Sequence, residues 1–200
     1  MNPATSASGS TPVVVSVDPV QAIDRWVDDR VDRLRGNQVT DAAMYAASFL
    51  GDDGKVWIAL SALRSQQATQ PLKHFLRQMA WLGIESAVVN GPAKGVVRRP
   101  RPTTVASHRH RLRRPSNSSF PSGHAASAAT MAMLLSEDGL APVWWTLAGS
   151  IALSRVYVGV HHASDVAAGL AAGAAIGWLA RKVDLPMLER EAPLPRPDAV

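Results

Sequence analysis

The stretch VAAGLAAGAAIGWLARKV at residues 166–183 decides the fold class. It is apolar almost throughout, and Gly169, Gly173 and Gly177 recur every four residues on one face of the predicted helix. A face of such small residues lets two helices approach closely, as helices do inside membranes. The alternative is that the same glycines and alanines pack the core of a soluble all-α protein.

Four further apolar segments have helical length. They cover residues 41–65, 72–97, 122–136 and 142–158. None has the ~20 uninterrupted apolar residues of an unambiguous spanning helix. Tryptophans at 144, 145 and 178 would lie at one level if the last two helices are antiparallel, which favours a membrane interface. We therefore expect an all-α bundle of about five to six helices, embedded in a membrane.

The ends of the chain differ from this apolar middle. Residues 1–17 lack the basic start and apolar core of a signal peptide, and they predict a disordered tail. Residues 18–35 space apolar side chains by three and four, which predicts an amphipathic helix, either packed on the body or lying at a membrane surface. Residues 186–200 predict a polar, proline-rich tail. A single helical domain is thus expected over 18–185, with its bundle at 41–183.

Charge is concentrated in one place. The 200-residue chain has a formal net charge of +5, yet the segment from Lys94 to Arg114 contains eight Lys and Arg residues and no Asp or Glu. The rest of the chain is therefore net negative. The chain has no cysteine, which excludes a disulfide scaffold, a thiolate zinc site and a cysteine nucleophile.

Three short stretches group polar residues at the edges of apolar segments. They read KGVVRRPRP at 94–102, PSGH at 121–124 and SRVYVGVHHASD at 154–165. Lys94, Arg101 and Arg155 are cations of the kind that holds phosphate. Ser122 and Gly123 predict a helix start whose free backbone N–H groups face an anion.

The histidines add the chemistry. His161 and Asp165 are four residues apart, so the carboxylate can hold the imidazole tautomer while the other ring nitrogen points at substrate. A histidine that attacks phosphorus needs such an orienting partner. His124, at the predicted helix start, is placed to protonate a leaving oxygen and later to draw a proton from water.

The three stretches resemble the three motifs of the type 2 phosphatidic acid phosphatase and vanadium haloperoxidase superfamily. The matched positions are Lys94, Arg101, Pro102, Pro121, Ser122, Gly123, His124, Ser154, Arg155, His161 and Asp165. The resemblance implies a helical bundle that hydrolyses a phosphomonoester or diphosphate, without metal or cofactor, through a phosphohistidine on His161. It also implies that Asp165 orients His161 and that His124 acts as acid and then base. The phosphate ligands that it implies are Lys94, Arg101, Ser122, Gly123 and Arg155.

We therefore expect an integral-membrane phosphatase acting on a phosphorylated lipid, with no nucleic-acid partner. The alternatives are a soluble acid phosphatase of the same superfamily, a vanadate-dependent haloperoxidase, and a nonenzymatic basic protein that binds nucleic acid through residues 94–114. Alternating helices would bring all three motifs to one end, and the positive-inside bias favours a cytoplasm-facing site. The arginines outside the motifs are expected to face solvent or lipid, or to contact an anionic head group; they are Arg98, Arg99, Arg109, Arg111, Arg113 and Arg114.

Overall fold

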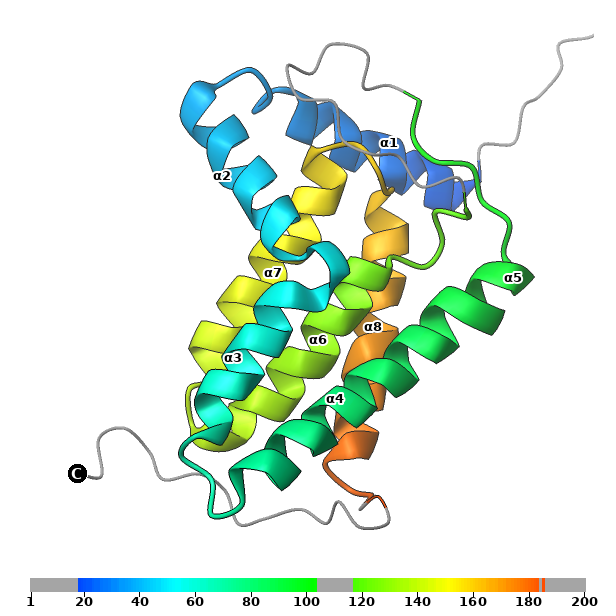
Figure 1. Ribbon diagram of the computed structural model, residues 1–200. Coiled ribbons are helices and arrows are strands. Elements are labelled where there is room, and N and C mark those ends of the chain that lie inside the picture. Colours follow the sequence, from blue (N-terminus) through cyan, green and yellow to red (C-terminus); the bar gives the residue numbers. More distant parts are fainter. Residues whose placement is uncertain (1–17, 104–116, 184, 186–200) are drawn as a thin grey trace, which may run out of the picture.

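The computed structural model describes residues 18–103, 117–183 and 185. Within these residues the chain is an all-α bundle with seven helices of at least 11 residues (Figure 1). The helices are α1 (Pro19–Asp32), α2 (Gln38–Leu50), α3 (Lys55–Ser65), α4 (Pro71–Val88), the short α5 (Lys94–Val96), α6 (Gly123–Leu135), α7 (Ala141–Tyr157) and α8 (Ala163–Ala180). The expected fold class is confirmed. The tails predicted at 1–17 and 186–200 lie outside the described residues.

One predicted segment is divided in two. Residues 41–65 form parts of α2 and α3, separated by a short turn at Asp52–Gly54. In this turn Asp53 has a φ of 54° and Gly54 a φ of 68°, left-handed values that a continuing α-helix does not adopt. This break gives the bundle more helices than the sequence predicts, and it leaves the acidic turn facing the start of α6.

The centre of the bundle is α6, which packs against α4, α7 and α8 (Figure 1). Nine of its thirteen residues are buried, most of them alanines. Small side chains allow neighbouring helices to lie close on several faces at once. The residue that begins α6 is Gly123, so the second polar stretch lies at one end of the central helix.

The glycine face of α8 packs directly on α6. A Cβ atom at Gly169 would lie 2.4 Å from the backbone oxygen of Ser122, and one at Gly173 would lie 2.0 Å from that of Ala126. Farther along, a Cβ at Gly177 would lie 2.6 Å from Met133. These distances leave no room for a methyl group, so the close helix contact predicted from the sequence is present.

Apolar side chains cover much of the outside of the bundle. Large exposed hydrophobic residues lie on α3, α4, α7 and α8, and they include Ile58, Leu63, Leu72, Leu76, Ile84, Val88, Val143, Leu153 and Leu179. Trp145 and Trp178 are exposed as well, whereas Trp144 packs inside the core. The predicted belt thus lacks Trp144, whose side of α7 faces the bundle. Among the described residues, α8 is the helix that is long and apolar enough to cross a bilayer.

The N-terminal helix α1 packs on the body of the bundle, which is one of its two predicted positions. It contacts α7 and α8, and it buries Asp24 and Val31 against the body. At the same time Ile23 and Trp26 are each more than half exposed. An amphipathic helix that presents such side chains outward is typical of a membrane surface.

Candidate active site

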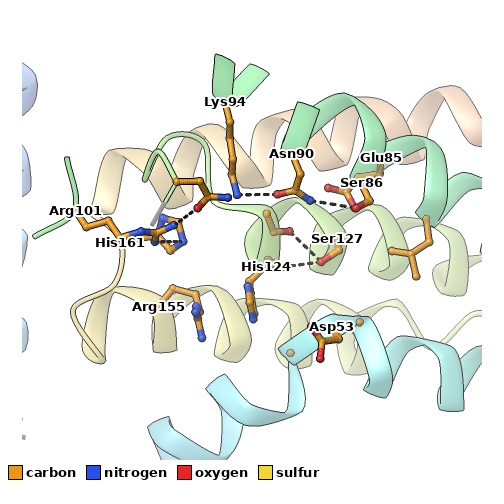
Figure 2. A pocket seen from close by; sticks show the side chains of 15 residues that line it. Asp53, Glu85, Ser86, Asn90, Lys94, Arg101, His124, Ser127, Arg155 and His161 are labelled. Atoms are coloured by element: carbon orange, nitrogen blue, oxygen red, sulfur yellow. Dashed lines mark hydrogen bonds between the residues drawn. The ribbon is translucent and has the colours of Figure 1, made fainter. Parts of the chain in front are cut away.

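The three polar stretches meet at one cavity of about 440 Å³. Lys94, Arg101, His124, Arg155 and His161, all predicted as site residues, line it (Figure 2). Gly123 lines it too. Ser122 and Asp165 are fully buried behind the lining. The alternation of α6, α7 and α8 therefore brings residues far apart in sequence to the same end of the bundle.

His161 lies in the turn between α7 and α8 and is almost completely buried. Its Nδ1 atom is 2.7 Å from the backbone oxygen of Ser119, and its Nε2 atom is 3.4 Å from the Arg101 guanidinium. A carbonyl oxygen only accepts, so Nδ1 carries the proton and donates it. This tautomer leaves Nε2 without a proton, so its lone pair, which faces the Arg101 guanidinium, can attack an electrophile.

The environment of His161 favours the neutral ring. Burial lowers the pKa of His161 below its usual value, the positive charges of Arg101 and Arg155 lower it further, and Asp165 acts in the opposite direction. A ring without a proton on Nε2 is the form that acts as a nucleophile.

Asp165 lies beside His161, as its spacing predicts, but the two residues do not share one continuous helix. His161 precedes the helix, because α8 begins at Ala163 with His162 as its N-cap. The closest approach of the carboxylate to His161 Nδ1 is 3.8 Å. Instead, Asp165 accepts a hydrogen bond of 2.9 Å from the backbone N–H of His162. The carboxylate thus fixes the turn that carries His161, while the carbonyl of Ser119 orients the ring.

The second partner of Asp165 is Arg99, which the sequence assigns to solvent or lipid. Arg99 donates to Asp165 at 2.7 Å and pairs with Asp24 of α1 at 2.5 Å. Burial disfavours the charged form of Asp24, but hydrogen bonds from Arg99 and Ser164 outweigh this and lower the pKa of Asp24. The expectation for Arg99 was therefore wrong, because two buried carboxylates hold it. Arg98 is exposed, and the other four arginines lie outside the described residues.

His124 has an acidic partner that the sequence analysis missed. Its Nε2 atom is 2.9 Å from Oδ1 of Asp52, in the turn between α2 and α3. The same carboxylate oxygen is 3.8 Å from Arg155, and Arg155 also donates to the hydroxyl of Ser48. The one available signal was the acidic pair at 52 and 53 inside an otherwise apolar segment.

The other cations are also held in place. Lys94 donates to the side-chain oxygen of Asn90 at 2.7 Å, and Arg101 donates to the backbone oxygen of Val160 at 2.8 Å. Burial and the charge of Arg101 lower the pKa of Lys94. Cations packed this closely repel one another unless an anion lies between them, so the arrangement suits a multiply charged anion.

The role predicted for the Ser122 amide needs correction. Its N–H donates to the backbone oxygen of Asp165 at 3.0 Å, and its hydroxyl caps α6 by accepting from Ala125 at 3.4 Å. Gly123 and His124 are the first two residues of α6, so their N–H groups have no acceptor within the helix. These two amides, rather than that of Ser122, are placed to meet an anion in the cavity.

Comparison with known proteins identifies a family for this chain. Residues 55–185 match the PAP2 superfamily. Two Mycobacterium tuberculosis proteins named decaprenylphosphoryl-5-phosphoribose phosphatase are each 41% identical over 112 residues, which cover 54% of this chain and 63% of theirs. The Mycolicibacterium smegmatis protein of that name is 35% identical over 62% of this chain and 68% of its own. The chain thus spans less than two thirds of the length of the M. tuberculosis relatives.

Solved structures support the fold. A transmembrane PAP2-type phosphatidylglycerolphosphate phosphatase from Bacillus subtilis superposes with a TM-score of 0.68 at 21% identity, over 84% of this chain and 87% of its own. Aquifex aeolicus LpxE superposes with a TM-score of 0.62 at 22% identity, over 86% and 99% of the two chains. With its family match running from α3 to beyond α8 and the motif residues gathered at one cavity, the chain belongs to the PAP2 superfamily.

Proposed function

We propose that this chain is a membrane-embedded lipid phosphatase that hydrolyses a phosphomonoester or diphosphate through a phosphohistidine on His161. The observation that carries the proposal is the cavity itself, which His161 lines together with three cations and a second histidine. We further propose that residues 18–185 act as one catalytic domain, because Asp24 of α1 is bonded to Arg99 beside the third motif.

The first step forms the phosphoenzyme. The Nε2 lone pair of His161 attacks phosphorus, the bond from phosphorus to the leaving oxygen breaks, and His124 gives that oxygen a proton. Lys94, Arg101 and Arg155 stabilise the charge on the phosphoryl oxygens as it develops. Each such preorganised contact contributes about 3 kcal/mol to catalysis, as an order of magnitude.

The second step releases phosphate. A water molecule attacks the phosphorus, His124 takes its proton, and the bond between phosphorus and Nε2 of His161 breaks. Inorganic phosphate leaves and both histidines return to their starting forms. The carboxylate of Asp52, bonded to His124, stabilises the cationic form of that ring, which is present before the first step and again after the second.

A lipid substrate in a membrane is supported by the outer surface. Large hydrophobic side chains are exposed on α3, α4, α7 and α8, and contiguous exposed apolar surface is typical of sites that meet a membrane or a partner. The curated relatives carry the name decaprenylphosphoryl-5-phosphoribose phosphatase, which supports a polyprenyl-linked phosphate as the substrate class.

For the sidedness, we propose a cytoplasm-facing site. Lys94, Arg99 and Arg101, which are basic residues of the described part of the chain, are at the site end, and two of the cations at the opposite end, Arg64 and Arg77, are buried inside the bundle. The test is an impermeant thiol reagent on intact cells carrying Gln38→Cys at the site end or Thr69→Cys at the opposite end, both exposed positions in a chain without cysteine. Labelling of Thr69→Cys alone is expected, and labelling of Gln38→Cys alone would refute the orientation.

The function itself is tested by phosphate release in detergent. The panel contains phosphatidic acid, phosphatidylglycerol phosphate, a polyprenyl diphosphate and decaprenylphosphoryl-5-phosphoribose, with and without a chelator. We expect release from at least one lipid, unchanged by the chelator and abolished by His161→Ala. Extraction of the protein from cells without detergent would favour the soluble acid phosphatase instead, and a strict divalent-metal requirement would overturn the mechanism.

A further inference from the structure

The cavity extends well beyond the phosphate site. From His161 and Arg101 it continues between α4 and α6 to the side chains of Glu85 and Ser86. Figure 2 shows the two ends of the cavity, with Lys94 and Asn90 lying between them. Its volume of about 440 Å³ is within the range of sites that bind whole small molecules. The space is therefore larger than a phosphate group needs.

The wall of this extension carries an unsatisfied acceptor. Glu85 is 1% exposed and lines the cavity, and its Oε1 atom has no hydrogen-bond partner among the described residues. A buried polar atom without a partner costs about 1–3 kcal/mol. Gln78 of the same helix also has an unpartnered oxygen, but Glu85 is the one of the two that lines the cavity. A ligand bound in the cavity can therefore supply the donor that Glu85 lacks.

The neighbouring polar groups fit the same kind of ligand. The Ser86 hydroxyl accepts from Asn90 at 3.1 Å, so its own proton is free to donate into the cavity. On the facing wall the Ser127 hydroxyl donates to the backbone oxygen of Gly123 at 3.0 Å, which leaves its oxygen free to accept. One wall thus offers an acceptor, Glu85, and a donor, Ser86, and the facing wall offers an acceptor, Ser127. This combination matches hydroxyl groups, each of which donates and accepts.

The charges argue against a cationic ligand at this position. Burial disfavours the charged form of Glu85, and the ammonium of Lys94 adds a positive charge near this side chain. Asp53, the other acidic residue in the lining, is bonded to Lys55 at 2.9 Å and is largely exposed. Because the extension has little net negative charge, neutral hydroxyl groups suit it better than an amine.

We propose that Glu85, Ser86 and Ser127 form a subsite for the hydroxyl groups of a sugar that carries the scissile phosphate. The inference rests on the proposed function, because the sugar is placed by its phosphate at Lys94, Arg101 and His161. It identifies the preferred substrate as a lipid-linked sugar phosphate rather than a phosphomonoester whose head group has no hydroxyls. Sites built to bond a hydroxyl discriminate strongly against analogues that lack it.

The test compares two phosphomonoesters of primary alcohols in the same detergent micelles. Decaprenylphosphoryl-5-phosphoribose offers ribose hydroxyls beside its 5-phosphate, whereas phosphatidic acid offers none. The measured quantity is the ratio of kcat/KM for the two substrates, so a general loss of activity cancels. The variants are Glu85→Leu, Ser86→Ala and Ser127→Ala. Glu85→Leu removes the acceptor and fills its buried position with an apolar side chain of similar size.

We expect Glu85→Leu to lower the ratio by roughly tenfold or more, and each serine variant to lower it roughly threefold to tenfold. Ser150→Ala is the matched control, because Ser150 likewise donates to the backbone four residues before it and does not line the cavity; its ratio should equal that of the wild type. An unchanged ratio in Glu85→Leu and Ser86→Ala, with both substrates hydrolysed, would overturn the subsite alone. Wild-type release from phosphatidic acid but not from the sugar phosphate would also overturn the subsite, whereas release from none of the four lipids of the panel would overturn the proposed function, and the subsite with it.

Discussion

Arg99 and Asp165 form a buried ion pair, with 2.7 Å between the guanidinium nitrogen and the carboxylate oxygen. Arg99 belongs to the first motif stretch and Asp165 to the third, and the same guanidinium reaches Asp24 in the N-terminal helix. Three segments far apart in sequence are thus joined directly behind His161. The N-terminal helix is thereby part of the framework that supports the site.

Breaking the ion pairs of Arg99 with Asp165 and Asp24 should impair catalysis, although none of these three residues is proposed to contact the phosphate. We expect Arg99→Ala and Asp24→Asn each to lower kcat roughly 10- to 100-fold, with a smaller effect on KM, because a lost hydrogen bond to a charged group is worth about 1.5–3 kcal/mol. Arg98→Ala, at the exposed neighbouring arginine, is the control and should keep wild-type kinetics. A normal kcat in Arg99→Ala would show that Asp165 does not need this support.

Asp52 should matter most when the leaving group is poor. We expect Asp52→Asn to slow hydrolysis of an alkyl phosphate by roughly tenfold or more, because His124 loses the carboxylate that stabilises its protonated form. With p-nitrophenyl phosphate, whose leaving group needs little proton donation, the loss should be much smaller. Equal losses with both substrates, measured as kcat/KM, would contradict a role for Asp52 through His124.

The pH dependence follows from the lowered pKa of His161. A group with a lowered pKa stays neutral to lower pH, so the acid limb of the kcat/KM profile should lie below the ordinary histidine value of about 6.5. Arg101→Met removes a positive charge that lowers this pKa, so the acid limb should move to higher pH. Both profiles use one substrate, so its own titration cancels in the comparison. If the acid limb of Arg101→Met lies at the same pH as that of the wild type, this limb does not report the titration of His161.

Much of this architecture could be predicted from local sequence, because it depends on short-range patterns. The glycine spacing in residues 166–183 predicts a close helix contact, and Gly173 does lie against Ala126. The motif spacing identifies residues that line one cavity, such as Lys94 and His161.

What could not be predicted depends on contacts between distant segments. Asp52 reaches His124 across 72 positions and Asp24 reaches Arg99 across 75, and no local pattern links such pairs. The acceptor for His161 is a backbone oxygen, that of Ser119, and every residue has one. The spacing of His161 and Asp165 correctly predicts that the two side chains lie close together, but it assumed a continuous helix where a turn precedes the N-cap.

The contact between α6 and α8 should tolerate no added methyl group. Gly173→Ala would place a Cβ atom 2.0 Å from a backbone oxygen, and overpacking of this kind costs about 1–3 kcal/mol or more. We expect a clearly lower thermal unfolding temperature in detergent. Gly149→Ala, in α7, is the matched control because a Cβ there meets nothing within 4 Å, and its unfolding temperature should be unchanged or higher. Similar values for the two variants would contradict the packing described.

The central claim is that His161 carries the phosphoryl group. The most direct measurement is a rapid quench under conditions that avoid acid, followed by mass spectrometry of the phosphoenzyme, with a substrate whose leaving group departs without a proton. His124→Gln should accumulate phosphohistidine at position 161, because the base that activates water is missing, while His161→Ala should show no phosphoenzyme and no turnover. A phosphoryl group on another residue, or continued turnover by His161→Ala, would contradict the mechanism.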